Sequence, residues 1–444
     1  MKVSQLMLFG VFLIGASAVQ AQEKSSLTLN EAIHLAWEQS AQVSLAESKV
    51  VTKKQELRTV KNNSYPDFKI SGQYQRLTDA DINFKLNNSD GSTSTTDAPS
   101  VNQLMVGQVN ASLPLFAGFK IQNSIKASSN LYAAESANAL QTKENVAMQV
   151  VDLYASMYKA EKTVELLKEN QKSAEQRVTD FIELEKNGII PRNDLLKAQL
   201  QASNVKLSLA KATKDLNIVN YQLITLLKLD DTTKLTIRES DFVNFQMNNI
   251  PTSDEVAVAN RQDLEAVRLQ EKASLDYVKV AKSGYYPAIS LVGGYTAIDL
   301  KNVITVQNAM NIGVGLSYDL SGILKNNAAV KVAESKADEL KKHEELLTEQ
   351  IKIEVQKAIE DYDLALKQDI VYNQAVEQAS ENYRILKDKY DNGLSDTNDL
   401  LEADVDQLES NINKALSKAN VIQKYYELLT VSGQLNQTFN LSKI

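Results

Sequence analysis

The sequence contains no cysteine among its 444 residues and is poor in proline, glycine and histidine. Without cysteine, the chain cannot form disulfides, thiolate metal sites or a thiol nucleophile, or carry a lipid on an N-terminal cysteine. Its six prolines and 15 glycines are few, which favours long, uninterrupted helices. The two histidines, His34 and His343, lie far apart and lack metal-ligand spacing. The absence of Met or His clusters argues against a relay for soft metals.

The chain also lacks the features that nucleic-acid binding or nucleotide hydrolysis would need. Its formal net charge is −8, and an acidic chain binds nucleic acid poorly. No glycine-rich phosphate loop followed by Lys and Ser or Thr opens a helix. We therefore expect no nucleic acid as partner, no cofactor and no enzymatic activity. A partner would have to supply the energy for any work.

The first residues are typical of a secretory signal peptide, which we place at 1–21. Lys2 is followed by an apolar stretch from Leu6 to Ala16, and Val19-Gln20-Ala21 offers small residues for cleavage. This stretch is shorter than the roughly 20 apolar residues that a membrane-spanning helix needs. The alternative is an N-terminal anchor that stays attached.

The most informative pattern is an internal duplication. Tyr65-Pro66 recurs as Tyr286-Pro287. Asn187-Gly188-Ile189, followed by Asp194-Leu195-Leu196, recurs with the same internal spacing as Asn392-Gly393-Leu394, followed by Asp399-Leu400-Leu401. A repeat of this length exceeds the unit of an ordinary solenoid. The chain therefore contains two similar halves.

Each half follows the same order of elements, as judged from the hydrophobic period and from turn residues. The first structural repeat, 22–230, is predicted to contain a helix (28–61), a β-hairpin (67–116), a long helix (120–186), a tip (187–193) and a return helix (194–228). An equatorial linker follows at 231–253. The second structural repeat, 254–433, is predicted to contain a helix (254–283), a β-hairpin (288–321), a long helix (325–391), a tip (392–398) and a return helix (399–432), before a C-terminal tail at 434–444.

The long and return helices carry apolar residues at alternating steps of four and three, which is a heptad seam. In the first long helix the seam includes Val146, Val150, Met157, Val164, Leu167, Ala174 and Phe181, with Gln171 as its polar member. The return helix has a matching seam that starts at Leu195. A tight turn joins the two helices. The pattern predicts an antiparallel coiled-coil hairpin in each half.

The strands alternate between apolar and polar residues and contain about ten residues each, the length that crosses a bilayer as tilted β-structure. Unpaired sheet edges are too costly in hydrocarbon, so four strands would have to close by association. Two chains would give eight strands, and three would give twelve. The alternative is a water-soluble four-stranded sheet packed on helices.

Taken together, the duplicated order of elements, the Tyr-Pro before each hairpin, and the two glycine-containing tips followed by Asp-Leu-Leu resemble the TolC-type outer-membrane efflux and secretion channel family. The resemblance implies a mainly α fold with a transmembrane β-barrel. A homotrimer of duplicated protomers would close a 12-stranded barrel and continue as an α-helical tunnel of long antiparallel coiled-coil helices. It also implies outer-membrane lipid as surroundings, a periplasmic helical extension, a periplasmic adaptor (membrane fusion protein) and an inner-membrane transporter.

Site residues follow from the resemblance by position. Asp399 and Glu402 stand where family members carry the acidic rings of the periplasmic constriction, and such rings attract cations. Alternatively, Asp399 is a helix N-cap and Glu402 its capping-box partner. Tyr390 and Asp194 match two residues of the tip gate links. Ser395 stands at the position of the third, an Arg, and Arg192 is a candidate to replace it.

The tips themselves, Gly188, Ile189, Ile190, Gly393 and Leu394, stand where the family contacts its adaptor. The alternative is plain helix capping by glycine with a hydrophobic contact. The resemblance thus implies a passive exit duct of a tripartite efflux pump or type I secretion system, gated at its periplasmic tips by an adaptor. A secreted structural or adhesive coiled-coil protein without a pore is the rival hypothesis. The transported substrate, the transporter class and the resting state do not follow from the sequence.

Overall fold

The structure is a computed structural model, and it describes residues 24–78, 86–87, 93–94, 101–243, 245 and 253–439. The predicted signal peptide, 1–21, lies outside these residues. The chain divides into two compact units. We call Gln42–Glu144, Pro251–Lys357 and Leu429–Ile444 the sheet unit, and Met1–Ala41, Asn145–Ile250 and Ala358–Leu428 the tip unit. The long helices α3 and α8 contribute residues to both units, and each unit is described by itself.

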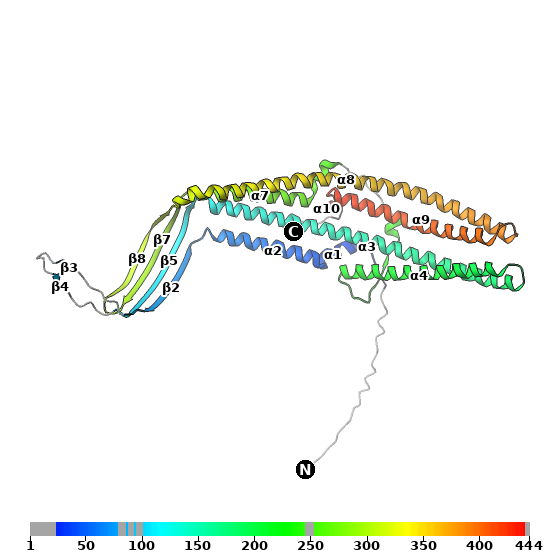
Figure 1. The fold of residues 1–444 in the computed structure, drawn as a ribbon, viewed down its shortest axis with the longest axis horizontal. Coiled ribbons are helices and arrows are strands. Elements are labelled where there is room, and N and C mark those ends of the chain that lie inside the picture. Colours follow the sequence, from blue (N-terminus) through cyan, green and yellow to red (C-terminus); the bar gives the residue numbers. More distant parts are fainter. Residues whose placement is uncertain are drawn as a thin grey trace, which may run out of the picture. The chain divides into compact units, whose positions relative to one another are not determined.

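Four long strands form one antiparallel sheet in the sheet unit (Figure 1). They are β2 (Asp67–Arg76), β5 (Gln103–Ala117), β7 (Ala288–Leu300) and β8 (Ile304–Ser317). The order is β2-β5-β7-β8, so the two hairpins of the duplicated sequence pair through β5 and β7. The short strands β3 (Leu86–Asn87) and β4 (Thr93–Ser94) pair with each other within the β2–β5 connection. Strands β2 and β8 each have a single neighbour in this sheet, so two edges are open.

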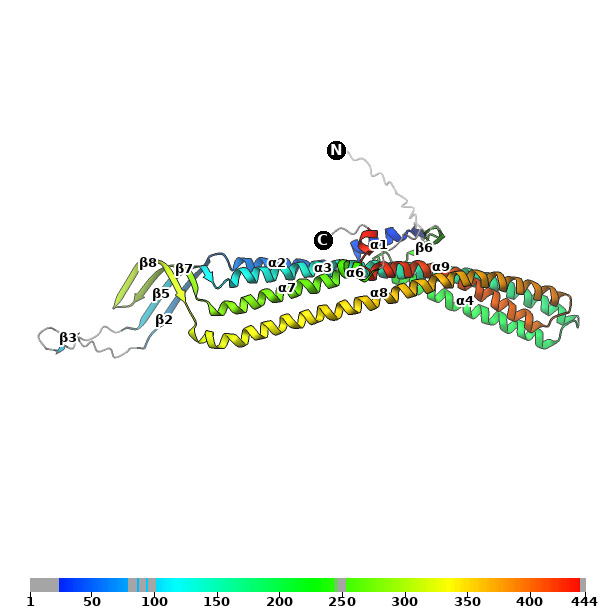
Figure 2. The same cartoon turned by 90° about the horizontal axis from the view of Figure 1, so that it is seen from above.

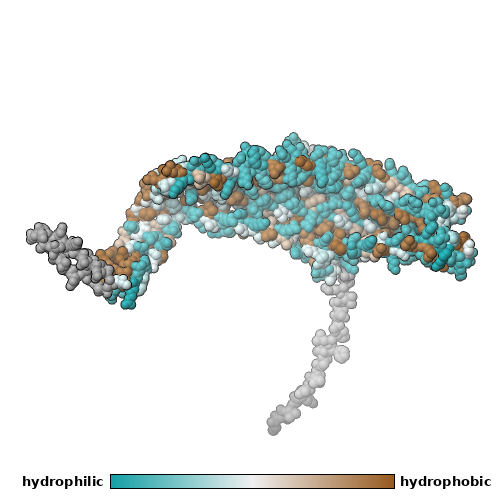
Figure 3. Space-filling model, viewed as in Figure 1, coloured by the Kyte–Doolittle hydropathy of each residue, from teal (hydrophilic) through white to brown (hydrophobic). Residues whose placement is uncertain are grey.

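The register of the sheet aligns the apolar residues of all four strands. Ile70 pairs with Val109, Val109 with Tyr295, and Tyr295 with Met310. Because side chains alternate across a strand, these residues share one face. That face is open: Ile312 on β8 is 82% exposed. Figure 3 shows apolar surface gathered along this sheet.

A glycine with left-handed backbone ends β5 and leads into α3 (Lys120–Lys186). Gly118 has φ of 59°, and a Cβ there would lie 2.7 Å from the Ser283 carbonyl oxygen. In the second half, α8 (Leu320–Asp391) begins at Leu320 rather than at residue 325, and β8 ends at Ser317. The predicted β-hairpin, 288–321, is therefore too long at its end, because Leu320 and Ser321 already belong to α8.

The short helices are interrupted where continuous helices were predicted. The segment 28–61 consists of α1 (Leu29–Gln39) and α2 (Ala41–Asn62), with Ser40 extended between them. The segment 254–283 consists of α6 (Asp254–Asn260) and α7 (Gln262–Lys282), with Arg261 extended between them. Ser40 and Arg261 are separated by the same interval as the duplicated Tyr65 and Tyr286. The interruption is thus part of the duplicated plan, and no Pro or Gly marked it in the sequence.

A polar cluster surrounds Arg261 within the sheet unit. Its guanidinium pairs with Asp263 at 2.6 Å and with Glu354 at 2.5 Å. Nearby, Glu144 on α3 is 1% exposed and accepts a hydrogen bond from the side-chain amide of Asn436. Asn436 belongs to α10 (Leu435–Thr438), so this bond ties the C-terminal helix to α3.

In the tip unit, α4 (Arg192–Leu226) runs antiparallel to α3, and α9 (Thr397–Val431) runs antiparallel to α8 (Figures 1 and 2). The seam predicted for the first hairpin is confirmed, since these of its members are buried: Val146, Val150, Met157, Val164, Leu167, Ala174 and Phe181. At 1.5 Å per residue, the 67 residues of α3 span about 100 Å.

The predicted linker contains regular structure. β6 (Lys234–Ile237) pairs in parallel with β1 (Lys24–Leu27), and α5 (Ser240–Val243) follows. Phe242 of α5 stacks on Tyr158, with ring centroids 4.1 Å apart, and the Tyr154 hydroxyl donates to Asp241 at 2.7 Å. These contacts fasten the linker to α3 within the tip unit.

None of the described helices contains a stretch that is both long enough and apolar enough to cross a membrane.

Candidate functional site at the two helical tips

Each coiled-coil hairpin turns through a glycine in left-handed conformation. Gly188 has φ of 73° and Gly393 has φ of 71°. The Ile189 N–H donates to the Leu184 carbonyl at 2.9 Å, and the Leu394 N–H donates to the Lys389 carbonyl at 2.8 Å. These six-to-one bonds define a Schellman motif at the end of each long helix. Both glycines are needed for backbone conformation rather than for space, since a Cβ would meet nothing within 4 Å.

The residues after the two glycines are apolar and largely exposed. Ile189 is 67% exposed and Leu394 is 77% exposed. Ile190, in contrast, packs partly buried against a small core. The glycines therefore do cap the two long helices. Capping does not explain why the apolar side chains of Ile189 and Leu394 are exposed.

A compact core lies just behind the first tip. Phe181, Leu195 and Ala198 are buried, and Tyr390 of α8 packs against them. The rings of Phe181 and Tyr390 stack at a centroid distance of 5.8 Å. The core therefore contacts both coiled-coil hairpins.

Asp194, one of the predicted gate residues, accepts a hydrogen bond from the other hairpin through Thr397, which was not among the predicted site residues. The buried Thr397 hydroxyl, at the start of α9, donates to Asp194 Oδ2 at 2.9 Å. Lys197 lies 3.4 Å from the other carboxylate oxygen. The only sequence signal for Thr397 was its place just before Asp399.

Tyr390, the second predicted gate residue, is in the same cluster, and burial raises the pKa of its hydroxyl. This hydroxyl has no well-formed hydrogen bond to the described residues, and the nearby Thr397 side chain only partly offsets the rise in its pKa. Arg192 does not contact Asp194 or Tyr390. Its guanidinium lies 3.8 Å from Glu185, within its own hairpin. Ser395, at the position of the absent Arg, donates to Asp399 Oδ2 at 2.8 Å.

Asp399 and Glu402 are both exposed and lie about one turn apart on α9. The sequence alternative, in which Asp399 caps the helix, is wrong. The Asp396 carboxylate accepts the N–H groups of Asn398 and Asp399, at 2.8 and 3.0 Å. The Asp396 side chain satisfies these free donors at the helix start, so the carboxylate of Asp399 is free of a capping role.

A buried ion pair behind the tips was also missed in the sequence. Arg177 of α3 donates to both carboxylate oxygens of Asp404 of α9, each at 3.0 Å, and to the Tyr383 hydroxyl of α8 at 3.3 Å. Burial by itself lowers the pKa of Arg177, but the hydrogen bonds and charge of Asp404 outweigh this effect and raise it. Without knowledge of which face of α9 is inward, neither residue stands out among the many charges of these helices.

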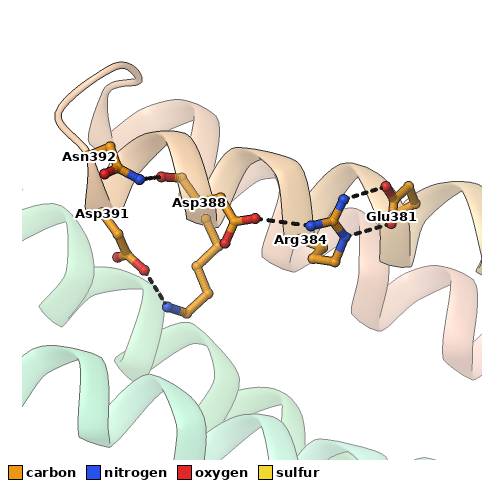
Figure 4. A network of polar contacts seen from close by, with 6 residues as sticks. Glu381, Arg384, Asp388, Asp391 and Asn392 are labelled. Carbon is orange, nitrogen blue, oxygen red and sulfur yellow. Dashed lines mark hydrogen bonds and ion pairs between the residues drawn. The ribbon is translucent and has the colours of Figure 1, made fainter.

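The end of α8 carries an exposed polar network of a different kind (Figure 4). Arg384 bridges Glu381 and Asp388, at 2.7 and 3.0 Å, and Asn392 donates to the Asp388 carbonyl at 2.7 Å. These pairs are solvated and lie along one helix. Such surface pairs contribute little to stability.

Three comparisons place these features among known proteins. The family model described as outer membrane efflux protein matches residues 32–227 and 255–434. No curated protein matches the chain.

Among solved structures, the outer-membrane channel OprN is 16% identical with a TM-score of 0.77, covering 95% of this chain and 96% of its own. CusC, described for transmembrane channel formation, is 17% identical with a TM-score of 0.79, and 92% of each chain is covered. The open state of the Neisseria gonorrhoeae MtrE outer membrane channel is 16% identical with a TM-score of 0.75, covering 92% of this chain and 89% of its own. At these identities the structural likeness shows the fold.

Proposed function

Because the chain belongs to the outer membrane efflux protein family, whose members are outer-membrane channels with periplasmic helical tunnels, we propose that it is the exit duct of a tripartite efflux pump or a type I secretion system. In this proposal the duct is passive, and a periplasmic adaptor gates its helical tips. The observation that carries the proposal is the combination, in one chain, of an open sheet with an exposed apolar face and two paired coiled-coil tips.

The sheet supports closure by association with further copies of the chain. Strands of 10 to 15 residues are long enough to cross a bilayer when tilted. The apolar face that includes Ile70 and Ile312 suits lipid, and the opposite face carries Lys69, Gln73 and Asn110. Open edges on β2 and β8 would leave backbone groups unpaired in hydrocarbon, which costs several kcal/mol for each group. Three copies would close a barrel of twelve strands.

Exposed apolar residues on the helices of the tip unit support the same assembly. Leu200, Leu207 and Tyr221 on α4 are exposed and are spaced by multiples of seven residues. Leu364, Val371 and Ile385 on α8 share this property: all are exposed at heptad spacing. A second heptad seam on a helix indicates a second helical neighbour. In a homotrimer, helices of adjacent copies would supply those neighbours and form the wall of a tunnel.

At the tips, the exposed side chains of Ile189 and Leu394 fit a contact with the adaptor. The carboxylates of Asp399 and Glu402 would form the constriction. Three copies would place six carboxylates around one narrow passage, which would favour cations over anions. An inner-membrane transporter would supply the cargo and the energy.

Single-channel recording of the purified trimer in a planar bilayer tests this proposal. We expect the wild type to show a small, cation-selective conductance, and Asp399→Ser/Glu402→Ser to show a larger conductance with weaker selectivity. Glu381→Ser, which removes an exposed carboxylate from the outer network of α8, is the matched control and should leave selectivity unchanged (Figure 4). A monomeric protein that stays soluble without detergent and never conducts would overturn the proposal.

A further inference from the structure

The buried pair of Arg177 and Asp404 lies at one level behind both tips. Arg177 precedes the tip glycine Gly188 by as many positions as Asp404 follows the tip glycine Gly393. At 1.5 Å per residue, Arg177 lies about 14 Å before the end of α3 at Lys186, and Asp404 lies about 11 Å after the start of α9 at Thr397. The pair therefore connects α3 to α9 at a greater distance from the tips than the hydrogen bond between Thr397 and Asp194 does.

The geometry of the Arg177–Asp404 pair can fix the orientation of α9 relative to α3. Both Arg177 terminal nitrogens face both Asp404 oxygens at 3.0 Å, and the side chains are only 11% and 6% exposed. A two-pronged contact between guanidinium and carboxylate restricts rotation as well as distance. The Tyr383 hydroxyl accepts a further bond from the guanidinium, so α8 also holds it in place.

Next to the tip, α9 has little else that would fix its rotation; directional contacts return only farther along, where Ser417 donates to Asp369 at 2.5 Å and Gln423 donates to Asp152 at 2.6 Å. The buried residues of these first turns of α9 are Thr397, Leu400 and Ala403 beside Asp404. Thr397 has one hydrogen bond to Asp194, and Leu400 and Ala403 make contacts without direction. Buried polar pairs in coiled coils are best known for setting register and orientation. The Arg177–Asp404 pair is placed to do the same here.

The rotation of α9 decides where the candidate constriction carboxylates point. At about 100° per residue, Asp399 lies about 140° around the helix from Asp404, and Glu402 lies about 160° from it in the other direction. With Asp404 held toward α3, both other carboxylates must point away from α3. Both are indeed exposed.

We propose that Arg177 is the positioning residue of the constriction: by holding Asp404, it sets the rotation of α9 and aims Asp399 and Glu402 into the passage. This inference rests on the proposed function, because it assigns a task within that channel. Family members carry an Arg at the position of Ser395. In this chain, Arg177 is an arginine that acts on the tip from a different position. When the pair separates, the tip end of α9 loses this restraint and can turn, so that both carboxylates leave the passage together.

The test compares ion selectivity in planar bilayers under a KCl gradient, with the reversal potential giving the permeability ratio of K⁺ to Cl⁻. We expect Arg177→Gln to lower this ratio by at least about threefold and to raise the resting conductance, although no constriction carboxylate has been changed. Arg384→Gln removes a guanidinium from the exposed network of α8 and is the matched control, with an unchanged ratio (Figure 4).

A second variant keeps the test decisive if Arg177→Gln leaves a buried carboxylate unpaired and the trimer does not form. Arg177→Gln/Asp404→Asn removes both charges, so no buried charge is left uncompensated. It should assemble and show the same lowered ratio, because a neutral amide pair holds α9 less firmly. Thermal unfolding of each trimer separates loss of stability from loss of selectivity.

The outcomes distinguish the two proposals. A conducting, cation-selective wild type whose Arg177 variants keep its permeability ratio would overturn this inference alone. Arg177 variants that lose selectivity in a channel where Asp399→Ser/Glu402→Ser has no effect would show that Arg177 acts on something else, which also overturns it. A wild-type trimer without conductance would remove the proposed function and this inference with it.

Discussion

Replacing Glu144 with Gln should remove a strong pH dependence from the stability of the sheet unit. Glu144 is 1% exposed and accepts a hydrogen bond from the Asn436 amide. Burial and the nearby Asp263 carboxylate raise its pKa to about 8, against a lowering effect of Arg261 and of the bond to Asn436. Gln has nearly the same shape as Glu but cannot ionise, so the variant isolates the charge.

The sign follows from proton binding. Between its ordinary pKa of 4.5 and about 8, folded Glu144 holds a proton that the unfolded chain has released. Its contribution to stability is therefore complete below pH 4.5 and is lost as the pH rises toward 8. Each pH unit in this window corresponds to about 1.4 kcal/mol. The free energy of unfolding should fall by up to about 3 kcal/mol between pH 4.5 and 7, and by up to about 5 kcal/mol by pH 8.

Denaturant unfolding of wild type and Glu144→Gln in detergent, from pH 4.5 to 8.5, measures this difference directly. The two proteins should be similar at the acidic end, and the variant should be increasingly more stable toward pH 8. Glu47→Gln serves as the matched control, because Glu47 is an exposed glutamate paired with Lys143 beside the same segment. Parallel stability curves for wild type and Glu144→Gln would refute the reasoning.

Three further predictions concern the other elements. Gly118→Ala should destabilise the fold by at least about 2 kcal/mol, since it forces a left-handed alanine with its Cβ 2.7 Å from the Ser283 carbonyl, as measured by denaturant unfolding. Ile312→Arg, on the exposed apolar face of β8, should cost about 2–4 kcal/mol of trimer stability if that face meets lipid, as measured by the yield of heat-resistant trimer in membranes; a normal yield would contradict a lipid-facing sheet. Asp194→Ala with Tyr390→Phe should raise the resting conductance, since it removes the bond to Thr397 and a buried hydroxyl from the tip; unchanged conductance would exclude both residues from the gate.

Much of the architecture could be read from the sequence because its signals are periodic. The heptad seam of α3 and the alternating strands repeat over many residues, so a few exceptions such as Gln171 do not obscure them. The duplication added a second copy of each signal. Glycines at the two tips marked the turns because left-handed backbone favours glycine there.

The interruptions of the short helices and the helix caps were harder to predict from the sequence. Ser40 and Arg261 break their helices without any Pro or Gly, and Arg261 is held in place by Asp263 and Glu354, which are distant from each other in sequence. At the second tip, Asp396 and Asp399 are equally plausible caps by residue type. Only the start of α9 at Thr397 decides between them.

By itself, the sequence determined the order of elements, the two tips and the amphipathic strands, because each of these depends on local periodicity and on turn residues; together they carried the resemblance to a channel family. The tertiary structure decided which polar side chains meet: Arg177 with Asp404, Thr397 with Asp194, and Glu144 with Asn436. The physical reason is that a charged residue on a long helix looks the same in sequence whether it faces water or another helix. Burial, which is a property of the packed helices together, converts a few of these many charges into fixed contacts.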